Sequence, residues 1–405
     1  LVSQSQWLVS LARSLEDVNH PLLGPNIKSL KVCGLILLEN MKYRICFYIS
    51  QVASFLFVSS LFVDLFVTTQ PFDELLFNLS VAAVSAVSLT KTACFLYWQE
   101  SWVLLINNIS TEERTKTLKL DPISLDMMKD YTKYSRFVTY VYWVLVAITS
   151  LAMISSPFLK YISTPDIRSG IEPFPTMISS WFPFNDKKLP GSAIAFLTQC
   201  FMCILGSIVI AAFDATSVTI MSFLKGQTVI LHKKCREIFG LKETISNTEV
   251  FKRIQECHRH HEFLLQQYQL FDSLLSPVMF IYVLVCSMSI CCSVVQLSMS
   301  EVHTSQKLWV LEYTVALSFQ LFIYCWHGNE VTHQSCLSDR VLFESNWWRG
   351  NRFTLKQFGL LDGKLFDGFV MNAGPFNTLS IESFINIMKG AYSFFVLFTQ
   401  KQENA

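Results

Sequence analysis

Charged side chains are scarce in this chain. Asp, Glu, Lys and Arg make up 16% of its 405 residues and apolar residues 51%, a balance unlike that of ordinary soluble domains. The charges nearly cancel, at a net of +1, so nothing in the composition indicates a nucleic-acid partner. The sequence instead indicates a membrane protein, in which each crossing needs about 20 mostly apolar residues.

Other signals are missing as well. The first 20 residues do not show the basic region, apolar core and cleavage site of a signal peptide. We therefore expect no signal peptide, and an amino terminus that stays in the cytoplasm, where the chain is made. No glycine-rich phosphate loop and no nucleophile paired with a base indicates an enzyme. Twelve cysteines follow no repeating pattern. The CxxC formed by Cys200 and Cys203 lies in an apolar run, which favours packing over metal or redox chemistry. We expect no metal and no cofactor.

What the chain does have is long apolar runs, and the basic residues between them set their orientation. Of the 32 Lys and Arg, 23 lie in segments that would share the amino-terminal side of the membrane. Basic loops stay in the cytoplasm, so we predict an all-α, polytopic protein with a cytoplasmic amino terminus and an extracellular carboxyl terminus, the reverse of a G-protein-coupled receptor. The seven apolar stretches are 45–67, 74–98, 135–157, 192–223, 275–297, 307–327 and 379–400.

Two polar segments have patterns of their own. In 224–274, apolar residues recur at near-helical spacing, which predicts helices that continue the spans into the cytoplasm. Cys257, His258, His260 and His261 lie together there; with no fourth ligand at a recognised spacing, we interpret them as a solvated basic face rather than a metal site. Residues 328–370 mix charge with aromatic rings, which predicts burial of the rings against neighbouring subunits. Gly374-Pro375 then breaks any helix, so the last span must start afresh.

Three blocks carry a family resemblance. YCWHGNEVTHQSCLSDRVLFESNWW (324–348) and MNAGPFNTLSIESFINIMKGAYSFFVLF (371–398) closely resemble the two carboxyl-terminal motifs of insect odorant receptors, and AAFDATSVTIMSFLKGQ (211–227) is similar to a third block. Asp214 lies in the third block; alternatively it is a charge at a helix end. Together the blocks cover about a sixth of the chain.

The resemblance implies a tetrameric, ligand-gated, non-selective cation channel in the plasma membrane of olfactory sensory neurons. Each tetramer combines ligand-tuned subunits with a shared co-receptor, and the short middle cytoplasmic loop makes this chain resemble a tuned subunit. A gustatory receptor channel and, less favoured because no internal repeat is found, a secondary transporter are the alternatives. The implied parts are a cytoplasmic segment 1–44, a ligand-binding bundle 45–223, a helical extension 224–274, spans 275–327, an inter-subunit anchor 328–378, a pore helix 379–400 and a tail 401–405.

The last span has a polar stripe. Its positions are spaced to fall on one helical face, and polar groups facing lipid are costly, so the stripe must face protein or water. The resemblance places the pore's narrow part near Leu397, with Gln400 at its mouth. Lys401 departs from the family pattern, which is apolar there, and a cation at the mouth would repel permeant cations. The stripe consists of Glu382, Asn386, Lys389, Ser393, Leu397 and Gln400.

The resemblance also implies a ligand pocket in the outer half of the bundle, among the second to sixth spans. Depth and inward spacing select its candidates, with Trp309 and Tyr313 foremost because each offers a ring and a polar group. Walls of this kind suit small, volatile, weakly polar molecules. The candidates are Phe77, Val81, Ser85, Val146, Thr149, Ser150, Met153, Phe196, Cys200, Cys203, Trp309, Tyr313 and Leu317.

Overall fold

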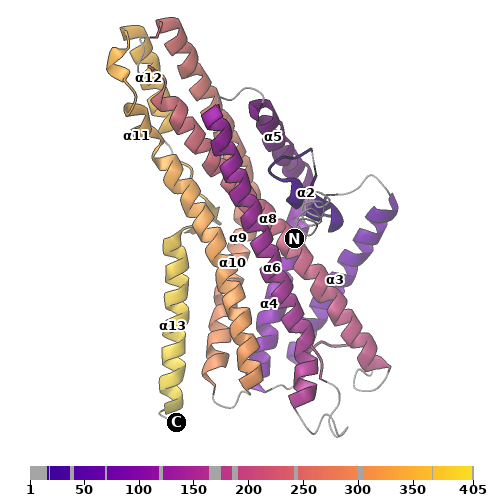
Figure 1. Ribbon diagram of the computed structural model, residues 1–405. Helices are drawn as coiled ribbons and strands as arrows, with labels where there is room; N and C mark the ends of the chain where they lie inside the picture. Colours follow the sequence, from indigo (N-terminus) through magenta and orange to yellow (C-terminus); the bar gives the residue numbers. More distant parts are fainter. Residues whose placement is uncertain are drawn as a thin grey trace, which may run out of the picture.

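The computed structural model confirms the all-α prediction (Figure 1). The helices are α2 (Gly24–Val32), α3 (Met41–Val67), α4 (Phe72–Tyr97), α5 (Gln99–Thr117), α6 (Pro122–Ser163), α8 (Gly191–Arg236), α9 (Asn247–Ser298), α10 (Thr304–Cys336), α11 (Ser338–Phe343), the 3-10 turn η1 (Trp347–Arg349), α12 (Arg352–Leu365) and α13 (Ile381–Glu403). The structure describes residues 16–17, 19–36, 41–68, 71–117, 122–163, 175–184, 190–240, 245–299, 304–366 and 368–403.

Six helices of the described part are long and apolar enough to cross a membrane: α3, α4, α6, α8, α9 and α10. Helix α13 is less apolar because Glu382, Asn386 and Lys389 interrupt its first half. The count of seven crossings and their orientation therefore stay predictions. The side chain of Lys401 and all of residues 404–405 lie outside the described residues.

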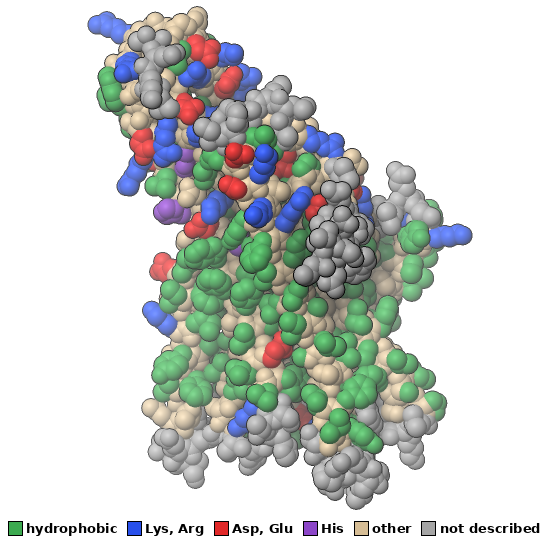
Figure 2. Space-filling model, in the orientation of Figure 1, with side chains coloured by type: hydrophobic (Ala, Val, Ile, Leu, Met, Phe, Trp, Pro, Cys, Tyr) green, Lys and Arg blue, Asp and Glu red, His purple; other side chains and the backbone are tan. Residues whose placement is uncertain are grey.

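Two helices are much longer than a bilayer is thick. Helix α8 has 46 residues and α9 has 52, which at 1.5 Å per residue is about 70 Å or more, against a hydrocarbon core of about 30 Å. Ser246 starts α9 by accepting a hydrogen bond from the Glu249 backbone, as an N-cap does. Charged side chains of both signs lie mainly on the half of this face that ends at α11 and α12, and apolar side chains dominate the other half (Figures 1 and 2).

A small hairpin separates α13 from the segment before it. Strands β1 (Asn372–Ala373) and β2 (Asn377–Thr378) pair antiparallel around Gly374, whose φ of 74° favours glycine. The hairpin is fixed to α9, because Asp272 accepts two hydrogen bonds of 2.9 Å from Asn372. The chain thus turns at Gly374-Pro375 and begins a new helix at Ile381, as the sequence predicts.

The interpretation of the Cys–His cluster on α9 as a solvated face is wrong for most of it. Cys257, His260 and His261 are buried, and only His258 is substantially exposed. The reason is that α9 packs against α8 and α12, so the face that carries these residues lies inside. Among the described residues, no group of three or more His, Cys, Asp or Glu is placed to hold a metal.

The aromatic rings of 328–370 divide into two sets. Phe358 and Phe369 are buried within the chain itself, where Phe369 stacks on Tyr268 with ring centroids 4.8 Å apart. Trp348 and Phe366 are exposed, at 63% and 74%. The single chain therefore leaves a second set of rings uncovered, and their burial against neighbouring subunits stays a prediction.

The segment before α3 is docked on the bundle. Leu22, Leu23 and Ile27 are almost fully buried, and the backbone N–H of Leu22 donates to the Glu113 carboxylate on α5, as does the Tyr131 hydroxyl. Burial raises the pKa of Glu113 from its ordinary 4.5 to about 7, although those two hydrogen bonds and the nearby Arg136 and Lys116 act in the opposite direction.

Glu113 should make the stability of the protein depend on pH. The pKa of Glu113 is higher in the folded than in the unfolded protein. Its contribution to the free energy of unfolding is therefore greatest below about pH 4.5 and is lost as the pH rises to about 7. The loss amounts to up to roughly 3 kcal/mol. We expect the unfolding temperature of the detergent-solubilised protein to fall across this window, and Glu113→Gln to flatten that dependence. An unchanged slope in the variant would contradict this role.

Candidate ligand cavity and buried ion pair

A cavity of about 130 Å³ lies between α3, α4, α6, α8 and α10. Its walls are mainly apolar, with a few hydroxyl groups and the amide of Gln51. An apolar cavity of about 150 Å³ in another protein holds benzene. The space therefore suits a small, weakly polar molecule.

The structure brings five of the sequence-predicted residues to this cavity: Val81, Ser85, Met153, Cys203 and Tyr313. The Tyr313 hydroxyl lies 3.2 Å from that of Ser80, and this hydrogen bond fixes the side chain that lines the cavity. Val81 and Ser85 are one turn apart on α4, as inward-facing residues must be.

The other eight predicted residues do not line the cavity. Phe77 and Trp309 pack edge to face next to it, with centroids 4.9 Å apart, and Thr149 donates to the carboxylate of Glu312. Ser150 reaches the wall indirectly, by a 2.7 Å hydrogen bond to the lining residue Ser207. Phe196 packs on Phe158. Val146 and Leu317 belong to apolar clusters, and Cys200 is half-buried without a place in the wall.

Sequence reasoning missed several wall residues. Ser88 and Thr92 continue the stripe of Val81 and Ser85 by two further turns of α4, so a longer helical projection would have found them. The wall from α3, which includes Ser54 and Phe57, has no such signal, because the sequence does not show which face of the first span meets the others.

Residues 175–184 close one side of the cavity through Ile178. The fully buried amide of Gln199 holds this segment: it accepts from the Met177 backbone and donates to the Ile178 carbonyl and the Ser180 hydroxyl, at 3.2, 2.7 and 2.8 Å. These three hydrogen bonds fix residues 177–180 against α8, so this side of the cavity has a defined position.

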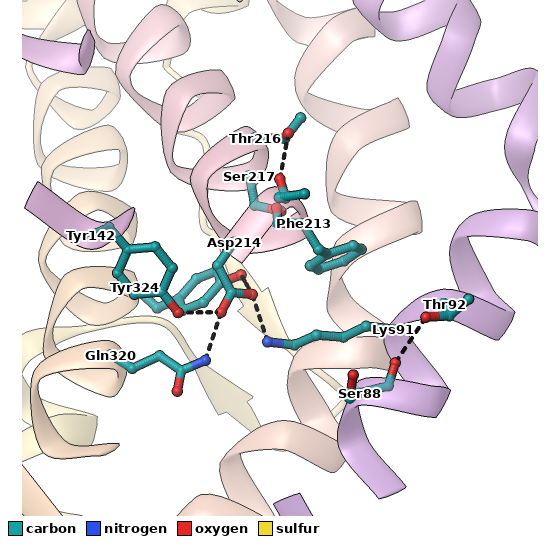
Figure 3. Close-up of polar contacts among 11 residues, drawn as sticks. Ser88, Lys91, Thr92, Tyr142, Phe213, Asp214, Thr216, Ser217, Gln320 and Tyr324 are labelled. Carbon is teal, nitrogen blue, oxygen red and sulfur yellow. Dashed lines mark hydrogen bonds and ion pairs between the residues drawn. The ribbon is translucent and has the colours of Figure 1, made fainter. Parts of the chain in front are cut away.

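Next to the cavity, an ion pair is buried in the bundle (Figure 3). Lys91 of α4 and Asp214 of α8 are each about 1% exposed, and the ammonium lies 2.5 Å from the carboxylate. The Tyr142 hydroxyl of α6 donates to the other carboxylate oxygen at 2.6 Å. From α10, Gln320 and Tyr324 donate as well, at 2.6 and 2.7 Å. Four helices therefore meet at one carboxylate.

The surroundings compensate both charges. The Lys91 ammonium also lies 4.8 Å from the centroid of the Tyr282 ring on α9, a favourable cation–π distance. Removing one member of such a pair costs about 3–5 kcal/mol, because the other charge is left buried alone. Asp214 lies in the middle of α8, so its interpretation as a helix-end charge is wrong.

The polar stripe of α13 lies on the surface of the single chain. Glu382, Asn386, Lys389, Ser393 and Gln400 are exposed, and Leu397 is 62% exposed. The opposite face, which includes Phe384 and Ala391, packs on α9 and α10. Helix α13 thus turns its most polar face away from its own subunit.

A family model described as the 7tm odorant receptor matches residues 71–392. The chain belongs to the insect odorant receptor family. It is 22% identical to odorant receptor 82a of Drosophila melanogaster over 79% of this chain and 82% of that protein, and 21% identical to odorant receptor Or2 of Anopheles gambiae over 51% and 56%.

The fold of this odorant receptor is also that of a solved structure. The olfactory receptor OR5 of the insect Machilis hrabei, determined in complex with eugenol, superposes with a TM-score of 0.75 at 13% identity, over 93% of this chain and 96% of that one. A second structure of the same receptor superposes with a TM-score of 0.72. Membership of the odorant receptor family, rather than this superposition, makes the chain a multi-pass membrane receptor of olfaction and not an enzyme.

Proposed function

We propose that this odorant receptor is the ligand-tuned subunit of a heteromeric, odorant-gated, non-selective cation channel. The observation that carries the proposal is the mostly apolar cavity of about 130 Å³ among five apolar helices. Few polar groups line the cavity, so it selects its ligand mainly by shape. Two ligands that differ by one methylene group would differ in binding free energy by only about 1–3 kcal/mol. Eugenol, the ligand of the Machilis receptor, is a small, weakly polar molecule of the kind that we expect here.

Helix α13 is the proposed pore helix. Its exposed polar stripe needs water or protein on that side, and one such helix from each of four subunits would enclose an axial path. Co-receptor subunits would supply the remaining helices, in the plasma membrane of olfactory neurons. The exposed rings of Trp348 and Phe366 offer the anchor segment a surface for those subunits. Family membership favours this function over the gustatory receptor alternative.

Co-expression with an odorant receptor co-receptor tests the function. We expect inward cation current when cells are exposed to a panel of eugenol, 1-octanol and ethyl hexanoate, extended to other small, weakly polar volatiles. Cells that express the co-receptor alone are the control, and they should stay silent to the same compounds. A complex that reaches the cell surface yet responds to none of a broad panel would contradict the proposal.

A further inference from the structure

We infer that the buried pair Lys91–Asp214, with the two α10 side chains that it holds, couples the cavity to the start of α13. Lys91, Asp214, Gln320 and Tyr324 would act as positioning residues: none contacts the ligand, but together they transmit its presence to the pore helix. This role rests on the proposed function, in which the cavity binds the ligand and α13 lines the pore.

The first step is the closeness of the pair to the cavity. On α4, Ser88 lines the cavity and Lys91 follows within one turn; on α8, Ile210 lines it and Asp214 follows by four residues. On α10, Tyr313 lines it, and Gln320 lies two turns further along the same face. Any ligand that moves these three helices at the cavity must move the groups that meet at Asp214.

The second step is the contact between α10 and α13. Phe322 of α10 meets Phe384 of α13 edge to face, with ring centroids 5.4 Å apart. Six residues further along, Gly328 approaches so closely that a Cβ there would lie 2.6 Å from the backbone oxygen of Leu379. Gln320 and Tyr324 flank Phe322 in the sequence, and both donate to the Asp214 carboxylate. Asp214 therefore fixes the part of α10 that packs against the first turns of α13.

The third step concerns what else the pair could do. The void beside Asp214 is only about 10 Å³, roughly the space of one water molecule, so the pair is not a second ligand site. Separating two opposite charges that are buried together has a high free-energy cost. The helices that carry them therefore move as a unit, and the hydrogen bonds to Gln320 and Tyr324 attach α10 to that unit.

The test compares the loss of the two hydrogen bonds that α10 donates to Asp214 with the loss of the one that α6 donates to it. The double variant Gln320→Met/Tyr324→Phe leaves the ion pair intact but releases α10, whereas Tyr142→Phe removes one hydroxyl on α6. Each is co-expressed with the co-receptor, and the current evoked by the most active of eugenol, 1-octanol and ethyl hexanoate is divided by surface protein. The ligand-induced shift of the unfolding temperature of the purified complex reports binding independently.

We expect the double variant to lose at least fivefold in evoked current per surface channel while it keeps the ligand-induced thermal shift. Tyr142→Phe should stay within twofold of wild type. Asp214→Asn should behave like the double variant where it reaches the surface. The control Lys225→Met, which breaks the partly exposed 2.6 Å pair with Glu330 between the same helices α8 and α10, should leave the current unchanged.

Wild-type current in the double variant would overturn the inference while leaving the proposed function intact. So would an equal loss in Tyr142→Phe, since it would show that any disturbance of packing has the same effect. Loss of the thermal shift together with the current would assign these residues to ligand binding or folding and would also overturn it. A wild-type complex without any evoked current would overturn the proposed function itself.

Discussion

Replacing Leu397 by serine is expected to raise the basal cation current of the channel roughly tenfold, because a ring of apolar side chains closes a pore by excluding water. Leu397 is 62% exposed in the single chain and continues the stripe formed by Asn386, Lys389 and Ser393. A hydroxymethyl group there would let water and ions pass without a ligand. Whole-cell current before odorant is added, divided by surface protein, measures the effect.

Phe394 provides the matched control. It is an exposed apolar residue of α13, at 50%, but lies about 100° around the helix from the centre of the stripe. Phe394→Ser should leave the basal current unchanged even if it reduces the amount of complex at the surface. Equal basal currents in Leu397→Ser and wild type would remove the pore assignment of this face, and so would an equal rise in Phe394→Ser.

The apolar runs predicted most of the architecture because each long helix has to satisfy its own backbone hydrogen bonds within the membrane. The break at Gly374-Pro375 was predictable for a similar local reason. Spacing in 224–274 predicted that helices continue there, but the sequence could not show that this part of α8 and α9 packs on α11 and α12. That packing also explains why His260 and His261 are buried.

The candidate site was only partly predictable. Spacing on α4 placed Val81 and Ser85 correctly on one face, and the structure brings both to the cavity. Lys91 and Asp214 were each visible as charges within apolar runs, but they are 123 residues apart in the sequence. Their pairing depends on how α4 and α8 cross, which no local pattern encodes. The same holds for the α3 wall and for the segment held by Gln199.

Gly206→Leu is expected to abolish or weaken the odorant response by filling the cavity. Gly206 is a wall residue inside α8, and a Cβ there would meet only the Ser88 hydroxyl, at 3.9 Å. A leucine side chain therefore has room to enter the space and compete with the ligand. We expect the concentration for half-maximal current to rise about tenfold or more, which corresponds to about 1.4 kcal/mol of lost binding.

The stability of the variant decides between a filled cavity and a damaged fold. Glycine inside a helix costs about 1 kcal/mol relative to good helix formers, so Gly206→Leu should unfold at the same temperature as wild type or higher. Gly206→Ala is the control: it gains helix propensity but adds only one methyl group, so its response should stay near that of wild type. If Gly206→Leu kept full sensitivity to every odorant that activates the wild type, the cavity between α4 and α8 would not be where the ligand binds. If both variants lost the response equally, the backbone of α8 would matter there rather than the space, because the two side chains differ mainly in the volume that they occupy.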